Sequence, residues 1–344
     1  MAIDLSNQDL SNQDLRHLNL RGAKAVNTDF TGCNLQGVQM DNIVADNATF
    51  DHARMTDAQL NCAELNGARF KKTRLDDASM ASINAVGAKF LTAFMDNVCL
   101  HRANLTKSAL NGSFVTNSDA RYLSLRDAKA VGVDFSGSQL EKSVMAGSTV
   151  SANFNGSILR GANLYSTDLR GSSFCKADIE GGNMSASRAS NCDFTGAHLV
   201  EADLASTNLA HDNFTAANVS NMRINGCNIK SATFNEIVGC TPYVKSLVIE
   251  GVKVSYTHKT VFIDNYSCRI DELYAFYNNC CHYYDEIFDR ERNEFVPGER
   301  MEKNYGIFIP ILMSPNALFL IAPVVLQALK SIPSQETGWE SDLS

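Results

Sequence analysis

An apolar residue stands at every fifth position over the first two thirds of this chain. The series runs from Leu5 to Val150, slips by one residue, resumes at Phe154 and continues to Phe234. All 47 of these centre positions are apolar. A period of five matches neither the period of about 3.6 residues of an α-helix nor the period of about two of a single strand. It predicts a short extended side followed by a corner, repeated many times.

The residues around each centre support this interpretation. Two residues before the centre, 35 of the 47 positions hold Ala, Ser, Thr, Cys or Gly, and Gly recurs 15 times two residues after it. Because side chains alternate along an extended segment, the centre and the small residue share an inner face, while the residue between them points outward. The corner that follows requires residues that tolerate positive φ, which explains the Gly and Asn found there.

Phenylalanine adds a second period. Phe centres mostly follow one another by 20 residues, which predicts four pentads per turn, with each ring over the previous one on the same wall. Coils about 4.8 Å apart bring such rings to stacking distance, and 47 pentads make a rod about 55 Å long. The predicted core ladder is Phe30, Phe50, Phe70, Phe90, Phe135, Phe154, Phe174, Phe194, Phe214 and Phe234.

The pattern resembles the pentapeptide-repeat family, whose motif is Ala-(Asp/Asn)-Leu-x-x, as in Ala162-Asn163-Leu164. The resemblance covers about two thirds of the chain and implies an all-β solenoid, a right-handed quadrilateral β-helix over residues 1–238. The first coils depart from the motif, because Ile3, Gln8, Gln13 and Leu18 replace the small residue, as expected of a capping repeat. The slip near 150–154 is expected to shorten one corner and kink the rod.

Residues 239–333 are expected to form a small mixed α/β C-terminal module. Alternating residues over 244–264 predict short strands, and near-helical spacing of apolar residues predicts a helix over 270–292. The segment 304–329 carries no charge and contains three prolines, so it is interpreted as a buried cap, a dimer interface or a membrane-docking segment. Its candidate docking residues are Ile307, Phe308, Leu318, Phe319, Leu320 and Val324. Residues 334–344 are expected to be a flexible acidic tail.

Charge limits the choice of partners. The formal net charge is −8, and residues 1–240 hold 24 Asp and Glu against 21 Lys and Arg. We therefore expect no direct contact with nucleic acid. The N-terminus lacks the basic patch and apolar run of a cleaved Sec signal. The expected location is the bacterial cytoplasm, or a host cell into which the protein is delivered.

The sequence contains no phosphate-binding loop, nucleophile elbow or zinc-protease motif, so neither an enzyme nor a cofactor is expected. The soft ligands Cys268, Cys280, Cys281 and His282 match no common zinc spacing. Cys280 or Cys281 as the nucleophile of a ubiquitin-ligase-like effector is a further alternative. Three other cysteines, Cys33, Cys192 and Cys227, occupy the small inward position and are expected to be buried thiols.

The leading hypothesis is a non-enzymatic scaffold that binds a protein partner. A pentapeptide rod with an apolar C-terminal segment is similar to bacterial effectors, some of which lie on host membranes, so docking through the C-terminal module and homodimerisation through it are considered. The alternative is a DNA-mimicking protein that binds gyrase, suggested by outward carboxylates such as Asp41 and Asp46. Arg69 and Lys89 lie on the same wall as Asp29, however, which is unlike the uniform charge of DNA.

Overall fold

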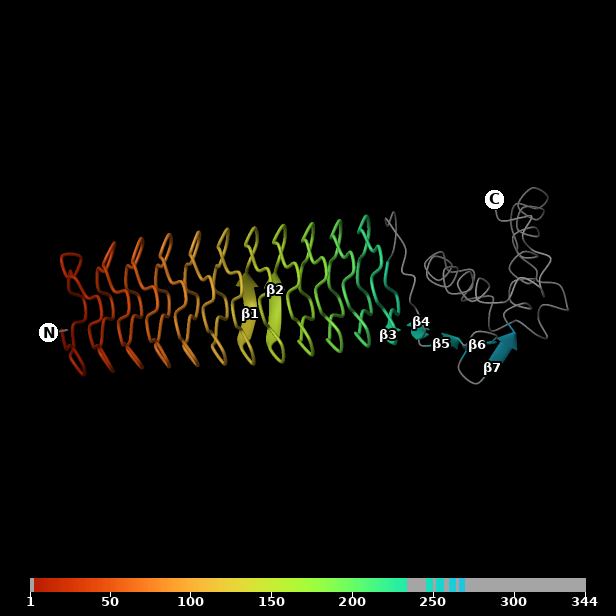
Figure 1. Ribbon diagram of the computed structural model, residues 1–344, viewed down its shortest axis with the longest axis horizontal. Coiled ribbons are helices and arrows are strands. Elements are labelled where there is room, and N and C mark those ends of the chain that lie inside the picture. The colour runs from red at the N-terminus through yellow and green to blue at the C-terminus, as the bar shows by residue number, and fades with distance from the viewer. Residues whose placement is uncertain (1–2, 234–245, 250–251, 257–259, 264–265, 270–344) are drawn as a thin grey trace.

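A computed structural model describes residues 3–233 and four later strands: β4 (Ser246–Ile249), β5 (Val252–Tyr256), β6 (Thr260–Ile263) and β7 (Tyr266–Arg269). Residues 3–233 wind into a straight stack of coils (Figure 1). A residue in each side of a coil pairs in parallel with its equivalent in the next coil, four pentads later, as Asn84 does with Asn104. With one side per pentad, each coil has four sides. The fold is the right-handed quadrilateral β-helix that the resemblance implied.

The corners explain the glycine and asparagine of the repeat. Most corners are turns closed by one hydrogen bond, such as the amide of Ala63 donating to the carbonyl of Leu60 at 3.0 Å. The second corner residue has positive φ, which is 62° at Gly22 and 57° at Asn42. The same conformation is imposed on Thr92, with φ of 53°, although a β-branched side chain is strained there.

The interior of the rod is filled with side chains. The centres and the small residues two positions earlier are buried along the described coils after the first. Undersized centres are compensated by a large neighbour, because Ile43 is buried beside Ala45 and Ile83 beside Ala85. This compensation keeps the packing density even along the axis.

The phenylalanine ladder differs from the prediction in one respect. The rings stack with centroids 4.6–5.4 Å apart, but they form two stacks on adjacent walls. Phe30 to Phe90 lie on one wall, on which Leu110, Ala130 and Val150 follow. Phe135 to Phe214 lie on the next wall, above Val115. The prediction of a single ladder was wrong, because the nine pentads from Phe90 to Phe135 exceed two coils by one side. Phe234 lies outside the described residues.

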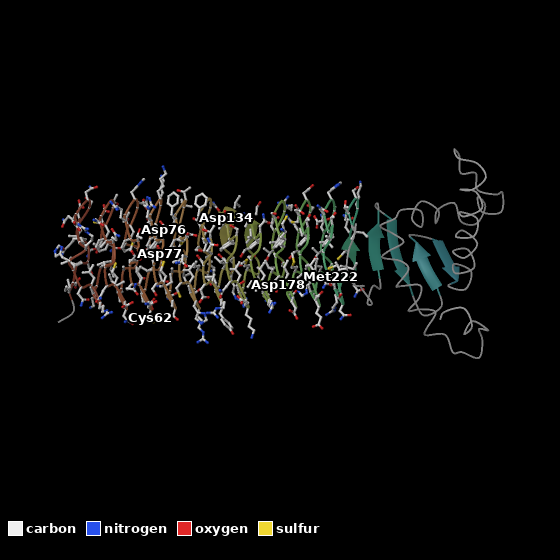
Figure 2. The ribbon with its side chains drawn as sticks, turned by 90° about the horizontal axis from the view of Figure 1, so that it is seen from above. Cys62, Asp76, Asp77, Asp134, Asp178 and Met222 are labelled. Carbon is white, nitrogen blue, oxygen red and sulfur yellow. The ribbon has the colours of Figure 1, made fainter. Side chains whose placement is uncertain are left out.

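The one-residue slip is absorbed at a corner. β1 (Lys129–Asp134) pairs in parallel with β2 (Thr149–Asn153), and the register shifts by one residue between Val131 and Val133. The coil that contains β2 therefore lacks a residue equivalent to Gly132. The coils on both sides of β1 and β2 follow one axis in Figures 1 and 2, so the shortened corner does not kink the rod.

The later strands extend one wall of the rod. β3 (Cys227–Asn228) pairs in parallel with β4, and Asn228 lies opposite Val248, which is the same sequence separation as between regular coils. β4, β5, β6 and β7 then follow as an antiparallel meander. The segment 244–264, in which alternation predicted short strands, thus contains β4, β5 and β6. The described residues include no helix able to span a membrane. The predicted helix 270–292, the segment 304–329 and the tail 334–344 lie outside the described residues.

Candidate functional site

Of the predicted site residues, the core ladder lies mostly within the described part of the chain and the docking residues lie outside it. The described members of the core ladder, Phe30 to Phe214, have fully buried side chains. They form the packing of the rod and are closed to ligands. The candidate docking residues, Ile307, Phe308, Leu318, Phe319, Leu320 and Val324, lie outside the described residues, as do Cys280, Cys281 and His282. The function supported by described residues must therefore be sought on the outer faces.

The inward cysteines are structural. The Sγ atoms of Cys33, Cys192 and Cys227 each donate to a main-chain carbonyl of the preceding coil, at 2.9–3.1 Å. Burial raises the pKa of the Cys227 thiol to about 12 and raises that of Cys192 further. A thiol held in its neutral form is a poor nucleophile. These cysteines act as small buried side chains, as predicted.

The outer faces carry polar ladders between coils (Figure 2). Asp41 Oδ1 accepts hydrogen bonds from the amide and the side chain of Asn61, at 3.0 and 3.1 Å. Asp46 and Asn66 repeat the arrangement. These side chains satisfy corner amides that no strand partner reaches, so most outward Asp and Asn residues have a structural role.

Two phenylalanines break this polar pattern. Phe94 and Phe114 occupy the outward position, are 42% and 44% exposed, and stack on each other at 5.5 Å. The guanidinium of Arg74 lies over the other face of the Phe94 ring, 6.0 Å from its centroid. Arg74, Phe94 and Phe114 are consecutive members of one outer column. Aromatic residues, phenylalanine included, and arginine are enriched at protein–protein interfaces.

A second exposed aromatic lies at another corner. The Tyr122 ring, 44% exposed, has the guanidinium of Arg102 at 5.6 Å and the ammonium of Lys142 at 5.7 Å from its centroid. His101 meets the same ring edge-on. Cations from the coils before and after lie over this tyrosine ring, whereas the Phe94–Phe114 pair has, among the described residues, a cation on one side only.

One group of side chains has the donors of a metal site. Asp178, Glu180 and His198 place one ligand atom each within 4.8 Å of one another. Arg160 Nε already lies 2.6 Å from Asp178 Oδ2 and 3.7 Å from Glu180 Oε2. A divalent cation would have to displace this guanidinium, so the group fits a surface ion-pair network better than a metal site.

Asp212 is the most perturbed acid among the described residues. It occupies the small inward position two residues before Phe214 and is 1% exposed. Its Oδ1 accepts the amide of Cys192 at 2.8 Å, while Oδ2 has no hydrogen-bond partner among the described residues. Burial raises its pKa to about 8. At neutral pH this carboxyl is largely protonated.

Comparison with known proteins agrees with this geometry. The family model for pentapeptide repeats matches in eight copies, over residues 2–37, 39–77, 99–137, 150–185 and 192–230, which is more than half of the chain. The chain belongs to the pentapeptide-repeat family. No curated protein matches it.

Several solved pentapeptide-repeat proteins are similar to it. One from the thylakoid lumen of Arabidopsis thaliana is 30% identical, over 27% of this chain and 67% of its own, with a TM-score of 0.27. HetL of the cyanobacterium Nostoc sp. strain PCC 7120, involved in heterocyst differentiation regulation, is 19% identical over 72% and 90%, with a TM-score of 0.21. QnrB1, a plasmid-mediated fluoroquinolone resistance protein, is 13% identical over 68% and 87%, with a TM-score of 0.21.

The sequence reasoning missed the functional candidates of this pentapeptide-repeat protein, although the signals were present. Phe94 and Phe114 are aromatic at the outward position, where Asp and Asn are common, and they are four pentads apart. Asp212 is an acid at a position that is small in 35 of 47 pentads. Both are departures from the repeat, and a search for such departures finds them.

Proposed function

We propose that this pentapeptide-repeat protein is a non-enzymatic scaffold that binds a protein partner on the outer faces of its rod. The supporting observation is the filled interior: stacked phenylalanines and their small neighbours occupy the space enclosed by the described coils. Binding chemistry must then lie outside, on side chains held at fixed spacings by the hydrogen-bonded coils. A rigid surface of this kind loses little entropy on binding.

Cross-linking in cells of the source organism, followed by mass spectrometry of the captured full chain, tests this proposal. We expect one or a few proteins cross-linked to lysines of the described rod, in amounts comparable with the chain itself. The same cells without cross-linker provide the background. A chain that is recovered alone from cross-linked cells contradicts a scaffold role.

The finer proposal concerns the C-terminal region. We infer that residues 304–329 help to dock the protein on a host protein or membrane after delivery as a bacterial effector. The support is the sequence of this segment, which is uncharged and apolar over a length sufficient for membrane contact. Co-sedimentation with liposomes separates the options: binding by the full chain but not by a chain ending at residue 300 is expected, and failure of both removes the membrane proposal.

DNA mimicry is the second candidate and receives less support from the surface. Along one outer column Asp29, Thr49, Arg69 and Lys89 follow one another, so the charge changes sign within two coils. Duplex DNA presents charge of one sign throughout. Gyrase supercoiling assays with micromolar protein are expected to show neither inhibition nor protection.

A further inference from the structure

The outer columns on either side of one corner combine unpaired positive charge with exposed aromatic rings. On the side before the corner, Arg69, Lys89 and Lys129 belong to one column and are exposed. On the side after it lie Phe94 and Phe114. We call these five residues, together with the corner lysines Lys71 and Lys72, the basic-aromatic surface. It lies within adjacent coils of the middle of the rod.

The lysine ammonium groups of this surface form no ion pair within the described part of the chain, although the Asp51 carboxylate accepts the main-chain amide of Lys71 at 2.9 Å. Arg69 is paired with Asp51 at 2.6 Å, but Lys71, Lys72, Lys89 and Lys129 form no ion pair with any described residue. Their ammonium groups are available to a partner. Coils are about 4.8 Å apart, so the three steps from Arg69 to Lys129 span about 15 Å, the length of about five extended residues.

The corner between the two columns is partly apolar. Successive corners stack through main-chain bonds, with the amide of Lys72 donating to the carbonyl of Leu91 and that of Gly112 to the carbonyl of Val131. Val131 is 47% exposed. The apolar residues Leu91 and Val131 thus share this corner with Lys71 and Lys72, between the column of Lys89 and that of the phenylalanines.

The ring geometry distinguishes between classes of partner. One face of Phe94 is covered by Phe114 and the other by Arg74. Nucleic-acid bases bind aromatic residues by stacking on free ring faces, which this pair does not offer along the column except at its end. Ring edges and a neighbouring arginine suit aliphatic or aromatic side chains of a protein instead.

The opposite border of the Phe column is acidic. Asp76 and Asp77 occupy the corner that follows Arg74 and lie close together in Figure 2, with Asp76 paired with Arg74 at 3.4 Å. Asp134 lies in the Phe column itself, one coil beyond Phe114. An anionic partner would be repelled from this border and attracted to the lysines. The surface therefore selects the orientation of the partner as well as its charge.

We propose that the basic-aromatic surface binds an acidic, extended segment of a partner protein, with a large apolar side chain packed on Phe94 and Phe114 and carboxylates paired with Lys71, Lys72, Lys89 and Lys129. The proposal rests on the scaffold function and names its partner class. The four lysines without internal partners supply the charge argument, and the exposed stacked pair supplies the apolar contact.

The test uses the full chain and a displayed library of random peptides, each long enough to cross the surface. The selected peptides are expected to combine Asp and Glu with Leu, Phe or Trp. The dominant peptide, synthesised with a fluorophore, is then titrated by fluorescence polarisation. We expect at least about tenfold weaker binding to Phe94→Ser/Phe114→Ser and to Lys71→Glu/Lys72→Glu. The matched controls Tyr165→Ser and Lys176→Glu/Lys230→Glu change exposed residues elsewhere on the rod, and less than about a twofold change is expected.

Three results overturn the proposal: selected peptides without acidic enrichment, binding unaffected by either surface variant, or tighter binding to a short DNA duplex than to the peptide. Circular dichroism of each variant must match that of the wild-type chain, and Phe94→Leu/Phe114→Leu replaces the serine variant if it does not. A peptide bound on another face removes this surface while leaving the scaffold function in place. Failure of the scaffold function is detected separately, by cross-linking in cells that captures no partner.

Discussion

Replacing Asp212 by serine should stabilise the protein at neutral pH. Asp212 is buried in a column where serines recur, and in that column Ser113 Oγ donates to the carbonyl of Phe90 in the preceding coil. A serine at position 212 should therefore fit the space, and its hydroxyl should donate a hydrogen bond to a main-chain carbonyl of the preceding coil. The carboxyl has no such arrangement, because Oδ2 lacks a partner among the described residues. Ionisation would leave a buried, unpaired charge.

The magnitude follows from the pKa. Burial raises the pKa of Asp212 to about 8 from an ordinary value of 3.8. The folded state holds this proton more tightly than the unfolded state does. The resulting contribution of Asp212 to the free energy of unfolding is fully present below the unfolded pKa and is lost as pH rises towards 8. At about 1.4 kcal/mol per pH unit, the wild-type chain should lose on the order of 4 kcal/mol between pH 4 and pH 7 through this residue.

Urea unfolding followed by far-UV circular dichroism, at several pH values, measures the effect. The free energy of unfolding of Asp212→Ser should exceed that of the wild-type chain at pH 7, and the two should converge near pH 4. Hydrogen exchange at the Cys192 amide, which donates to Asp212 Oδ1, reports the same region locally. A difference between the two proteins that does not vary with pH would refute the reasoning.

Asp193→Asn provides a control of opposite sign. Partial burial opposes ionisation of Asp193, but hydrogen bonds from Thr195 and Cys175 together lower its pKa. Its contribution is therefore present above the unfolded pKa and is lost as pH falls through the folded pKa. On acidification the wild-type chain should lose its stability advantage over this variant, whereas it should recover its stability deficit relative to Asp212→Ser.

Three further predictions concern packing and corners, and each is measured by urea unfolding. Phe174→Ala should lower the free energy of unfolding by about 3–5 kcal/mol, because it opens a cavity in a closed stack of rings. Phe94→Ala, on the surface, should lower it by less than about 1 kcal/mol. Equal losses would contradict the assignment of inner and outer positions. Thr92→Gly should stabilise by about 1 kcal/mol, since φ of 53° strains a β-branched residue, and a loss of stability would count against it. Gly182→Ala should destabilise by about 1–3 kcal/mol, because its Cβ would lie 2.8 Å from Ile179 Cγ2; an unchanged midpoint would show that the coil has room there.

Much of the rod could be predicted because the five-residue period and the 20-residue spacing of phenylalanine together define the coil. The position of each residue within a pentad fixes whether it faces inward, outward or towards a corner, and Ile43 with Ala45 shows that even volumes are compensated locally. The prediction of a single phenylalanine ladder was wrong because Phe90 and Phe135 are nine pentads apart, which is one side more than two full coils. Counting pentads in groups of four places Phe135 one wall away.

The candidate surface was harder to predict, because its members are dispersed in the sequence. Lys71, Lys89 and Phe114 become neighbours only when four-sided coils are stacked in register. The continuation of one wall by β4 was also not foreseen, since Leu247 and Val248 do not continue the motif although they lie one coil length after β3. The repeat defines the scaffold well, and the residues of the proposed surface are departures from it.

Engineered disulfides test the register of the coils most directly. Outward residues on adjacent coils should be close enough to bridge, because paired parallel strands are about 4.8 Å apart. Oxidation followed by peptide mapping should find the bridge in Asn84→Cys/Asn104→Cys, between regular coils, and in Gln139→Cys/Ile158→Cys, across the shortened corner. Gln139→Cys/Leu159→Cys should not form it, because Leu159 faces the core. Absence of the bridge between positions 84 and 104 would contradict the four-sided stack, and a bridge to position 159 in preference to 158 would contradict the location of the slip.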